Sequence, residues 1–189
     1  MEAILTCLRR LAPHVVRDEV AITGSAAARL RPPADLDLVV ARHGVVAASV
    51  CRDFLVSHHH DGDRLVFQLV DPVSRARVDI FIDRLGAIAT ARTADHGWRV
   101  VSPDVLLLHK LEILAKASAE RPIDPKHAAD AQALAAQLGR DVPPVDRSTL
   151  RAEVYSTNVA ARCARCDAAN DPAFPLAPKE QIFRLLGYV

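Results

Sequence analysis

The sequence predicts an α/β fold of the mixed, α+β type, in which a small mixed sheet with flanking helices is followed by a helical part. Two observations predict it. Short segments rich in Val, Ile and Leu, each bounded by turn residues, recur before about residue 100. Beyond that point apolar residues recur three and four positions apart over longer segments, as they do in helices. We therefore expect a core in residues 1–100 and a helical C-terminal region in residues 101–189.

The first part supplies the elements of the sheet in order. Residues 2–11 predict an amphipathic helix that ends before Pro13. A strand at 19–23 leads through a Gly-Ser turn into a short Ala-rich helix that ends near Arg31, before two prolines. The remaining expectations are a strand at 36–41, a helix at 45–56, a turn-rich loop at 58–63, and strands at 65–70 and 77–82.

The second part predicts helices. Pro103, one residue after Ser102, and the apolar spacing that follows indicate the first turn of a helix. Another helix is expected at residues 126–138, where Gly139 ends it. We also expect a hinge at 143–146, a long helix at 147–167 and a short helix at 178–186.

The composition is that of an ordinary globular protein. The chain has 189 residues, of which 50% are hydrophobic and 25% charged, and its formal net charge is +1. This balance excludes a protein that coats polyanions through its overall charge, and it excludes an acidic tail. No apolar run approaches the roughly 18 residues that span a bilayer, and the N-terminus has no signal-peptide layout. We expect a cytoplasmic protein with no membrane partner and with its four cysteines reduced.

Three aspartates stand out against apolar neighbours. Asp35 and Asp37 lie two residues apart at a predicted strand, so their side chains share one face, and Asp79 lies in another strand-like segment. Asp83 takes the place of Asp79 if the register differs. Three carboxylates on one face repel one another, and Mg²⁺, which prefers oxygen ligands and keeps phosphates among them, would relieve that repulsion. Two such ions about 3.5–4 Å apart promote an in-line displacement at phosphorus.

The Gly24-Ser25 turn supplies a complementary feature. The N–H groups at the start of a helix favour phosphate oxygens, and a glycine lets the backbone approach closely. The turn begins eleven positions before Asp35. The two features together predict a site for a metal-bound nucleoside triphosphate.

This arrangement resembles the nucleotidyltransferase superfamily of the DNA polymerase β type, whose signature is a Gly-Ser turn, then Asp-x-Asp, then a third acid. The downstream part resembles the minimal nucleotidyltransferases of the abortive-infection toxin class. Those enzymes carry a Lys in a helix after the sheet, matched here by Lys110, and then a basic residue four positions before an Asp, matched by Lys126 and Asp130. The resemblance covers residues 19–138. Two positions depart from it: Ala34 stands where many relatives have Ser or Thr, and His127 follows Lys126 where relatives often have Asp.

The resemblance implies a nucleotidyltransferase-type sheet and the transfer of a nucleoside monophosphate from an NTP such as ATP to an acceptor hydroxyl, with release of pyrophosphate. The cofactor would be Mg²⁺ or Mn²⁺. The acceptor would be tRNA, a protein or a small molecule, and a cognate antitoxin would be a further partner. The implied catalytic and metal-binding residues are Asp35, Asp37 and Asp79. The implied nucleotide-binding residues are Gly24, Ser25, Lys110, Lys126 and Arg31, with Arg29 as a weaker candidate.

Other interpretations of the same chain stay open at this point. It could be a non-catalytic protein of the same fold that binds nucleotide or a partner, or an adenylyltransferase that acts on small molecules such as antibiotics. Lys126 and Asp130 could form a simple ion pair between residues four apart on a helix, and Lys110 could extend to solvent from an amphipathic helix.

Further groups have simpler interpretations. Cys163 and Cys166 lack a second ligand pair, so we expect two thiols one helical turn apart rather than a zinc site. We expect His58–His60 in a solvated loop. An arginine stripe on the long third helix could meet RNA phosphates, but twenty of the 24 basic residues are Arg, which favours a solvated face; its members are Arg147, Arg151, Arg162 and Arg165.

Overall fold

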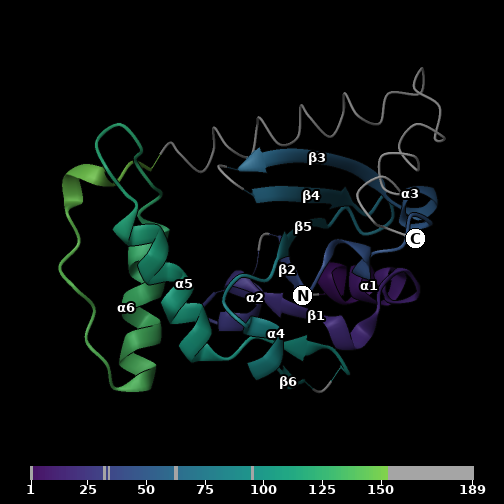
Figure 1. Ribbon diagram of the computed structural model, residues 1–189, viewed down its shortest axis with the longest axis horizontal. Coiled ribbons are helices and arrows are strands. Elements are labelled where there is room, and N and C mark those ends of the chain that lie inside the picture. The colour runs from purple at the N-terminus through teal and green to yellow at the C-terminus, as the bar shows by residue number, and fades with distance from the viewer. Residues whose placement is uncertain (1, 32, 34, 62–63, 95, 153–189) are drawn as a thin grey trace.

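The fold is built on a seven-stranded mixed sheet (Figure 1). It is known from a computed structural model, which describes residues 2–31, 33, 35–61, 64–94 and 96–152. The strand order is β3-β4-β5-β2-β1-β7-β6. The strands are β1 Val20–Thr23, β2 Leu36–Val40, β3 Leu55–Asp61, β4 Arg64–Val70, β5 Arg77–Ile82, β6 Arg92–Thr93 and β7 Arg99–Val100. The pairs β2/β5 and β1/β7 are parallel and the other pairs are antiparallel, so the predicted mixed α/β fold is confirmed.

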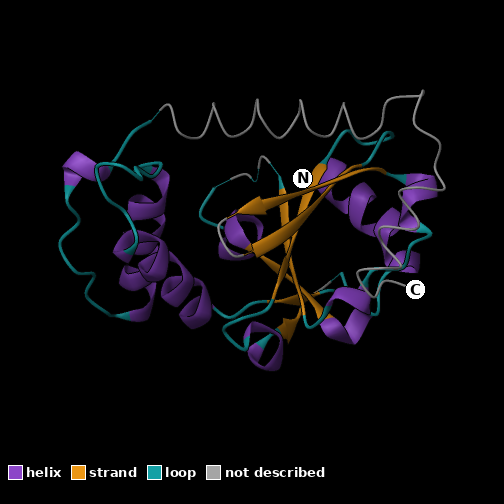
Figure 2. Ribbon diagram, turned by 45° about the horizontal axis from the view of Figure 1, so that its top comes forward, coloured by secondary structure: helices purple, strands orange, loops and turns teal. Residues whose placement is uncertain are grey.

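Helices cover both sides of this sheet (Figure 2). They are α1 Glu2–Leu11, α2 Gly24–Ala28, α3 Val50–Asp53, α4 Ala87–Thr90, α5 Pro103–Ala115 and α6 Lys126–Leu138. Short 3-10 turns lie at Ala12–His14, Arg17–Glu19, His43–Val45 and Arg147–Thr149. No helix within the described residues is long and apolar enough to cross a membrane.

The alternation of side chains along β2 divides the core into two clusters. Leu36, Leu38 and Val40 belong to a cluster that includes the buried residues of α1 and α3. Val39, between them, belongs to a second cluster with residues of α4, α5 and α6. Because neighbouring residues on a strand face opposite sides, Asp37 shares its side with Val39. Asp37 therefore lies on the face of the sheet that the helical part covers.

The segment at 45–56 does not form the predicted helix. It contains a 3-10 turn and the four-residue α3, which ends at an extended Phe54. Phe54 and Val56 are buried whereas Leu55 is 40% exposed, and this alternation is the pattern of a strand. The chain therefore continues into β3, which pairs with β4 as far as Asp61. The prediction of a loop at His58–His60 was wrong, because these residues form part of that strand.

Three other elements differ from expectation. The helix after Gly24 ends at Ala28 rather than near Arg31, because Arg29 adopts a left-handed conformation with a φ of 53°. The elements α4, β6 and β7 lie between residues 83 and 100, where we had predicted none. The helix predicted to begin near Ser102 is confirmed and ends at Ala115, and the predicted helix at 126–138 is confirmed with Gly139 at a φ of +63°.

The chain after α6 differs from the predicted long helix where the structure describes it. Arg147 lies in a 3-10 turn, and Leu150 forms an isolated bridge with Ile123. Arg147 and Arg151 therefore do not lie on one long helix. The rest of the predicted helix at 147–167, the helix at 178–186, and Arg162, Cys163, Arg165 and Cys166 lie outside the described residues.

Candidate functional site

A row of polar side chains crosses the middle of the sheet. In the strand register, Thr23 of β1 lies opposite Asp37 of β2, Asp37 opposite Asp79 of β5, and Asp79 opposite Gln68 of β4. Register partners point to the same face. Thr23, Gln68 and Asp79 are buried, with 4%, 6% and 3% of their surface exposed, and Asp37 is half-buried. The register thus brings two of the three predicted acids together on neighbouring parallel strands.

The third predicted acid lies just before this row. Asp35 is half-buried in the bend that precedes Leu36, the first residue of β2. The negative charges of both Asp35 and Asp37 act on the ammonium group of Lys126. Asp35 and Asp37 therefore lie within electrostatic range of a common cation at the start of α6.

Gly24 is fitted against the carboxylate of Asp37. A Cβ atom at residue 24 would lie 2.0 Å from Asp37 Oδ2 and 2.8 Å from its Cγ, which is closer than real Cβ atoms approach. Residue 24 also has a φ of +63°, a conformation that glycine adopts without penalty. Ser25 follows it in the first turn of α2 and is half-buried. The short turn predicted from the sequence therefore closes directly onto the acidic row.

The carboxylate of Asp83 binds backbone N–H groups of the loop that follows β5. Its carboxylate oxygens accept hydrogen bonds from the backbone N–H groups of Leu85, Ala87 and Ile88, at 3.1, 2.9 and 2.8 Å. These bonds hold the loop between β5 and α4 and the start of that helix. Asp79, by contrast, lies in the polar row, so Asp79 is the stronger of the two candidates for the third acid.

Asp130 holds two of the predicted nucleotide-binding cations. Its side chain is 3% exposed, and it forms ion pairs with Arg31, which follows α2, and with Lys110 of α5. Arg31 donates to both carboxylate oxygens of Asp130, and Lys110 Nζ lies 2.9 Å from Oδ2. Although burial alone would raise the pKa of Asp130, the hydrogen bonds from Arg31 and Lys110 outweigh it and hold that pKa below its usual value.

These contacts correct two of the simple interpretations of the sequence. The ion pairs of Asp130 are made with Lys110 and Arg31, not with Lys126 four residues earlier on the same helix. Lys110 does not extend to solvent, because its side chain is only 10% exposed and is held within the contact of α5 and α6. Lys110, Arg31 and Asp130 are thus a cluster that joins the two parts of the chain.

His127 and Lys126 have pKa values that fit this environment. The pKa of His127 falls to about 3, chiefly because of burial and then because of the charges of Lys110 and Lys126. Lys110 Nζ lies 3.3 Å from His127 Nδ1, which a neutral imidazole permits. Burial also lowers the pKa of Lys126, while Asp124, Asp35 and Asp37 act in the opposite direction.

Whether these residues suit a divalent metal ion depends on which other ligands the ion would have. Within the described residues, no group of three or more His, Cys, Asp or Glu side chains is arranged to hold a metal ion, so the predicted acidic trio is not a ready-made metal centre. The side-by-side carboxylates of Asp37 and Asp79 are nevertheless hard oxygen ligands of the kind that Mg²⁺ uses together with waters and phosphate oxygens. The residues therefore fit a metal ion whose remaining ligands come with a nucleotide.

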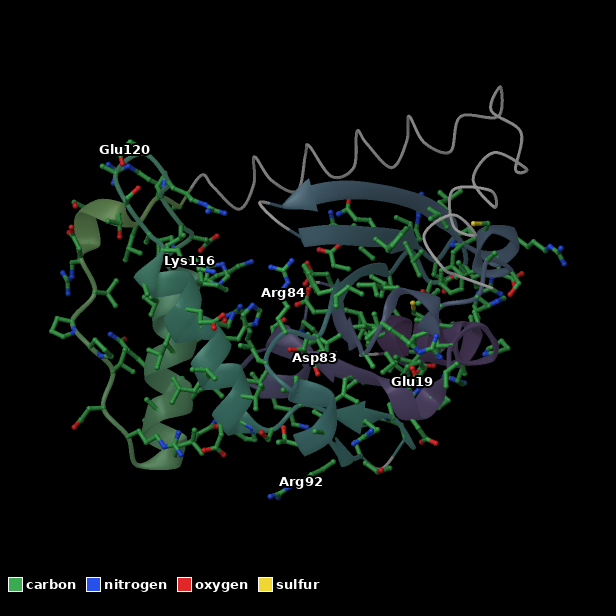
Figure 3. All side chains as sticks on the ribbon, in the orientation of Figure 1. Glu19, Asp83, Arg84, Arg92, Lys116 and Glu120 are labelled. Carbon is green, nitrogen blue, oxygen red and sulfur yellow. The ribbon has the colours of Figure 1, made fainter. Side chains whose placement is uncertain are left out.

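A hollow lies beside the row, between the sheet and helices α4 and α5. It begins at Thr23 and continues past Phe81 to Arg84 and His109, and its other lining residues are mainly apolar. In Figure 3 Arg84 lies between the strands and α5, with Asp83 nearby. The sequence did not single out Thr23, Gln68, Arg84 or His109, because only the strand register and the packing of α5 bring them to the acids.

The comparisons with known proteins are distant. The sequence matches no protein-family model and no curated protein. Among solved structures, the chain is similar to the Megavirus polyadenylate synthase, with 9% sequence identity and a TM-score of 0.43 over 90% of this chain and 36% of that one. It is similar to a mutant of the Cid1 poly(U) polymerase bound to MgATP, with 17% identity and a TM-score of 0.37 over 68% and 46% of the two chains. It is also similar to JHP933 from Helicobacter pylori, with 13% identity and a TM-score of 0.35 over 97% and 90%.

The chain thus spans less than half the length of the first two proteins. A polyadenylate synthase and a poly(U) polymerase are nucleotidyltransferases. None of these names is that of an abortive-infection toxin, so that narrower resemblance stays a prediction.

Proposed function

We propose that this chain is a metal-dependent nucleotidyltransferase, which transfers a nucleoside monophosphate from an NTP to an acceptor hydroxyl and releases pyrophosphate. The observation that carries the proposal is the position of Asp37 and Asp79 side by side on parallel strands, with Gly24 closed against Asp37. Two neighbouring carboxylates repel one another, and a divalent cation bound by both relieves that repulsion. A fold that keeps them together is expected to use them for binding one.

The reaction needs little more than positioning and neutralisation of charge. The acceptor oxygen attacks the α-phosphorus, and pyrophosphate leaves on the opposite side. Mg²⁺ or Mn²⁺ held by Asp37 and Asp79, with Asp35 beside them, would neutralise charge on the phosphate and on the attacking and leaving oxygens. Asp79, the most buried of the three acids, would orient the acceptor hydroxyl and accept its proton.

The cations of the helical part would serve the phosphates. Lys126 lies close enough to Asp35 and Asp37 for their charges to act on it, so its ammonium group would balance the acids before the nucleotide binds and the phosphates afterwards. Lys110 and Arg31 would add positive charge from their places on Asp130. Gly24 and Ser25 would receive the terminal phosphates. In this proposal the catalytic core at 1–100 and the helical region at 101–189 each supply one side of the cleft.

The acceptor is the least constrained part of the proposal. The hollow beside Thr23, with apolar walls and with Arg84 and His109 among its lining residues, is a place for part of the acceptor or of the nucleoside. A tRNA acceptor would require an extended contact with phosphates, and activity would then fall steeply with salt. A small-molecule acceptor would show a weak dependence on salt.

The test is transfer of label from each of the four α-³²P-labelled NTPs, with Mg²⁺, to components of a cell extract. Fractionation into RNA, protein and small molecules identifies the acceptor class. We expect one labelled class with the wild-type protein and at least a 100-fold weaker signal with Asp37→Asn, because a lost metal ligand removes the charge stabilisation on which this reaction depends.

The matched control is Asp18→Asn. Asp18 is an exposed acid that lies before the start of β1, whereas Thr23 of the polar row lies at the end of that strand. It should keep full activity. Nucleotide binding that is independent of Mg²⁺ and insensitive to Asp37→Asn, with no labelled product, would replace this proposal with that of a non-catalytic binding protein.

A further inference from the structure

Gln68 belongs to the polar row although nothing in the sequence marks it. It lies on β4 directly opposite Asp79, and only 6% of its surface is exposed. Its side-chain Nε2 donates a hydrogen bond to Asp79 Oδ1 at 3.1 Å. A hydrogen bond to an ionised carboxylate is stronger than one between neutral groups.

The carbonyl oxygen of the same amide, Gln68 Oε1, is the more informative atom. Within the described part of the chain, no donor lies within hydrogen-bonding distance of Gln68 Oε1, which is fully buried. Turning the amide over does not solve the problem, because it would place the carbonyl oxygen against the carboxylate of Asp79. A buried carbonyl without a donor is unfavourable, and such groups are few in folded proteins. An apolar side chain would fill this space without that disadvantage.

The use of a glutamine at this position therefore depends on its N–H group. We infer that Gln68 is a positioning residue for Asp79: its amide fixes the orientation of the Asp79 carboxylate so that the carboxylate can share a cation with Asp37. This inference rests on the proposed function. Groups that hydrogen-bond to metal-binding carboxylates typically change metal affinity or activity by about 10–100-fold when they are replaced.

Replacing Gln68 should lower the nucleotide affinity only when the metal ion is present. With Gln68→Met, which keeps the length of the side chain and removes both the N–H group and the unpaired carbonyl, nucleotide affinity in Mg²⁺ should fall by about 10–100-fold. Nucleotide affinity in EDTA should not change, because the proposed contacts of Lys110 and Lys126 with the phosphates do not depend on Gln68. A merely structural role would lower both affinities together.

The experiment is calorimetric titration of the whole chain with ATP, CTP, GTP and UTP, each in Mg²⁺ and in EDTA. The matched control is Val70→Met, two residues further along the same face of β4 and opposite Arg77 rather than Asp79. It should bind like the wild-type protein in both buffers. Gln68→Asn, whose amide is one methylene too short to reach Asp79, gives a second variant if the methionine variant does not fold.

The outcomes separate this inference from the proposed function. If the wild-type protein shows no metal-dependent nucleotide binding, the proposed function fails and this inference with it. If the wild-type protein binds in a metal-dependent way and both Gln68 variants bind equally well, the proposed function stands and the role of Gln68 is refuted. An equal loss of affinity in Mg²⁺ and in EDTA would also refute it.

Discussion

Replacing Gly24 with alanine should damage both the fold and the site, for reasons that can be separated. The new Cβ would lie 2.0 Å from Asp37 Oδ2, so the carboxylate would have to move by at least 1 Å to reach even the 3.0 Å below which real Cβ atoms are essentially never found. Forcing an extra carbon into a packed site typically costs about 1–3 kcal/mol. The left-handed backbone at residue 24 adds about 1–2 kcal/mol for a residue other than glycine.

The sum is a destabilisation of about 2–5 kcal/mol. For a chain of 189 residues, each kcal/mol lowers the midpoint of thermal unfolding by roughly 2–4 °C. A displacement of about 1 Å in a reacting group can also reduce activity by about 100-fold. The assays are calorimetric unfolding and the transfer of label from NTP.

Gly139 provides a matched control for this substitution. It has the same φ of +63°, but a Cβ there would meet nothing within 4 Å. Gly139→Ala should therefore show the backbone penalty alone, about 1–2 kcal/mol, and should keep its activity. Equal unfolding midpoints for the two variants, together with normal transfer by Gly24→Ala, would refute the close approach of Gly24 to Asp37.

The remaining predictions concern the buried ionisable groups. Asp130→Asn should lower the free energy of unfolding, measured by chemical denaturation, by about 3–5 kcal/mol, because the substitution leaves a buried ion-pair cluster without its anion. The control Asp104→Asn breaks an exposed ion pair and should change the free energy of unfolding by less than about 1 kcal/mol. The His127 imidazole should show constant NMR shifts from pH 8 to pH 5, because its pKa is about 3. In the unfolded chain the His127 imidazole binds a proton near pH 6.5, whereas in the folded chain it stays neutral, so the free energy of unfolding falls as the pH drops from 6.5 to 4. His127→Gln should make this fall smaller. An unchanged slope of the free energy of unfolding against pH would contradict the low pKa of His127. Burial raises the pKa of Cys7 to about 12, so iodoacetamide at pH 8 should modify Cys7 only after denaturation, as mass spectrometry of its peptide would show.

Local patterns predicted the parts of the site that neighbours in the sequence define. The spacing of Asp35 and Asp37 after Gly24, and the helix boundaries at Pro103 and Gly139, depend on turn and strand geometry within a few residues. The structure has the corresponding turn, strand and helices in those places.

Residues that meet only through long-range pairing could not be predicted in this way. Gln68 reaches Asp79 because β4 and β5 pair in one particular register, and a shift of one residue would turn it to the opposite face. The partners of Asp130 could not be found from the sequence either, since Lys126 is near in sequence whereas Arg31 is 99 residues away. The histidines at 58–60 were placed in a loop because they precede Gly62 and its flanking acids, a pattern typical of turns, whereas the alternation of the buried Phe54 and Val56 before them indicates a strand.

The Asp130 cluster has a consequence for any attempt to divide the protein. Arg31 belongs to the sequence before residue 100 and Asp130 to the sequence after it, yet the two share a bidentate ion pair. A fragment that stops at residue 100 would lose the anion that anchors Arg31, and it would also bare Ala21 and Val39, which pack with α5 and α6. We therefore predict that the sequences on the two sides of residue 100 fold together, and that neither piece alone will refold or recover function by simple mixing.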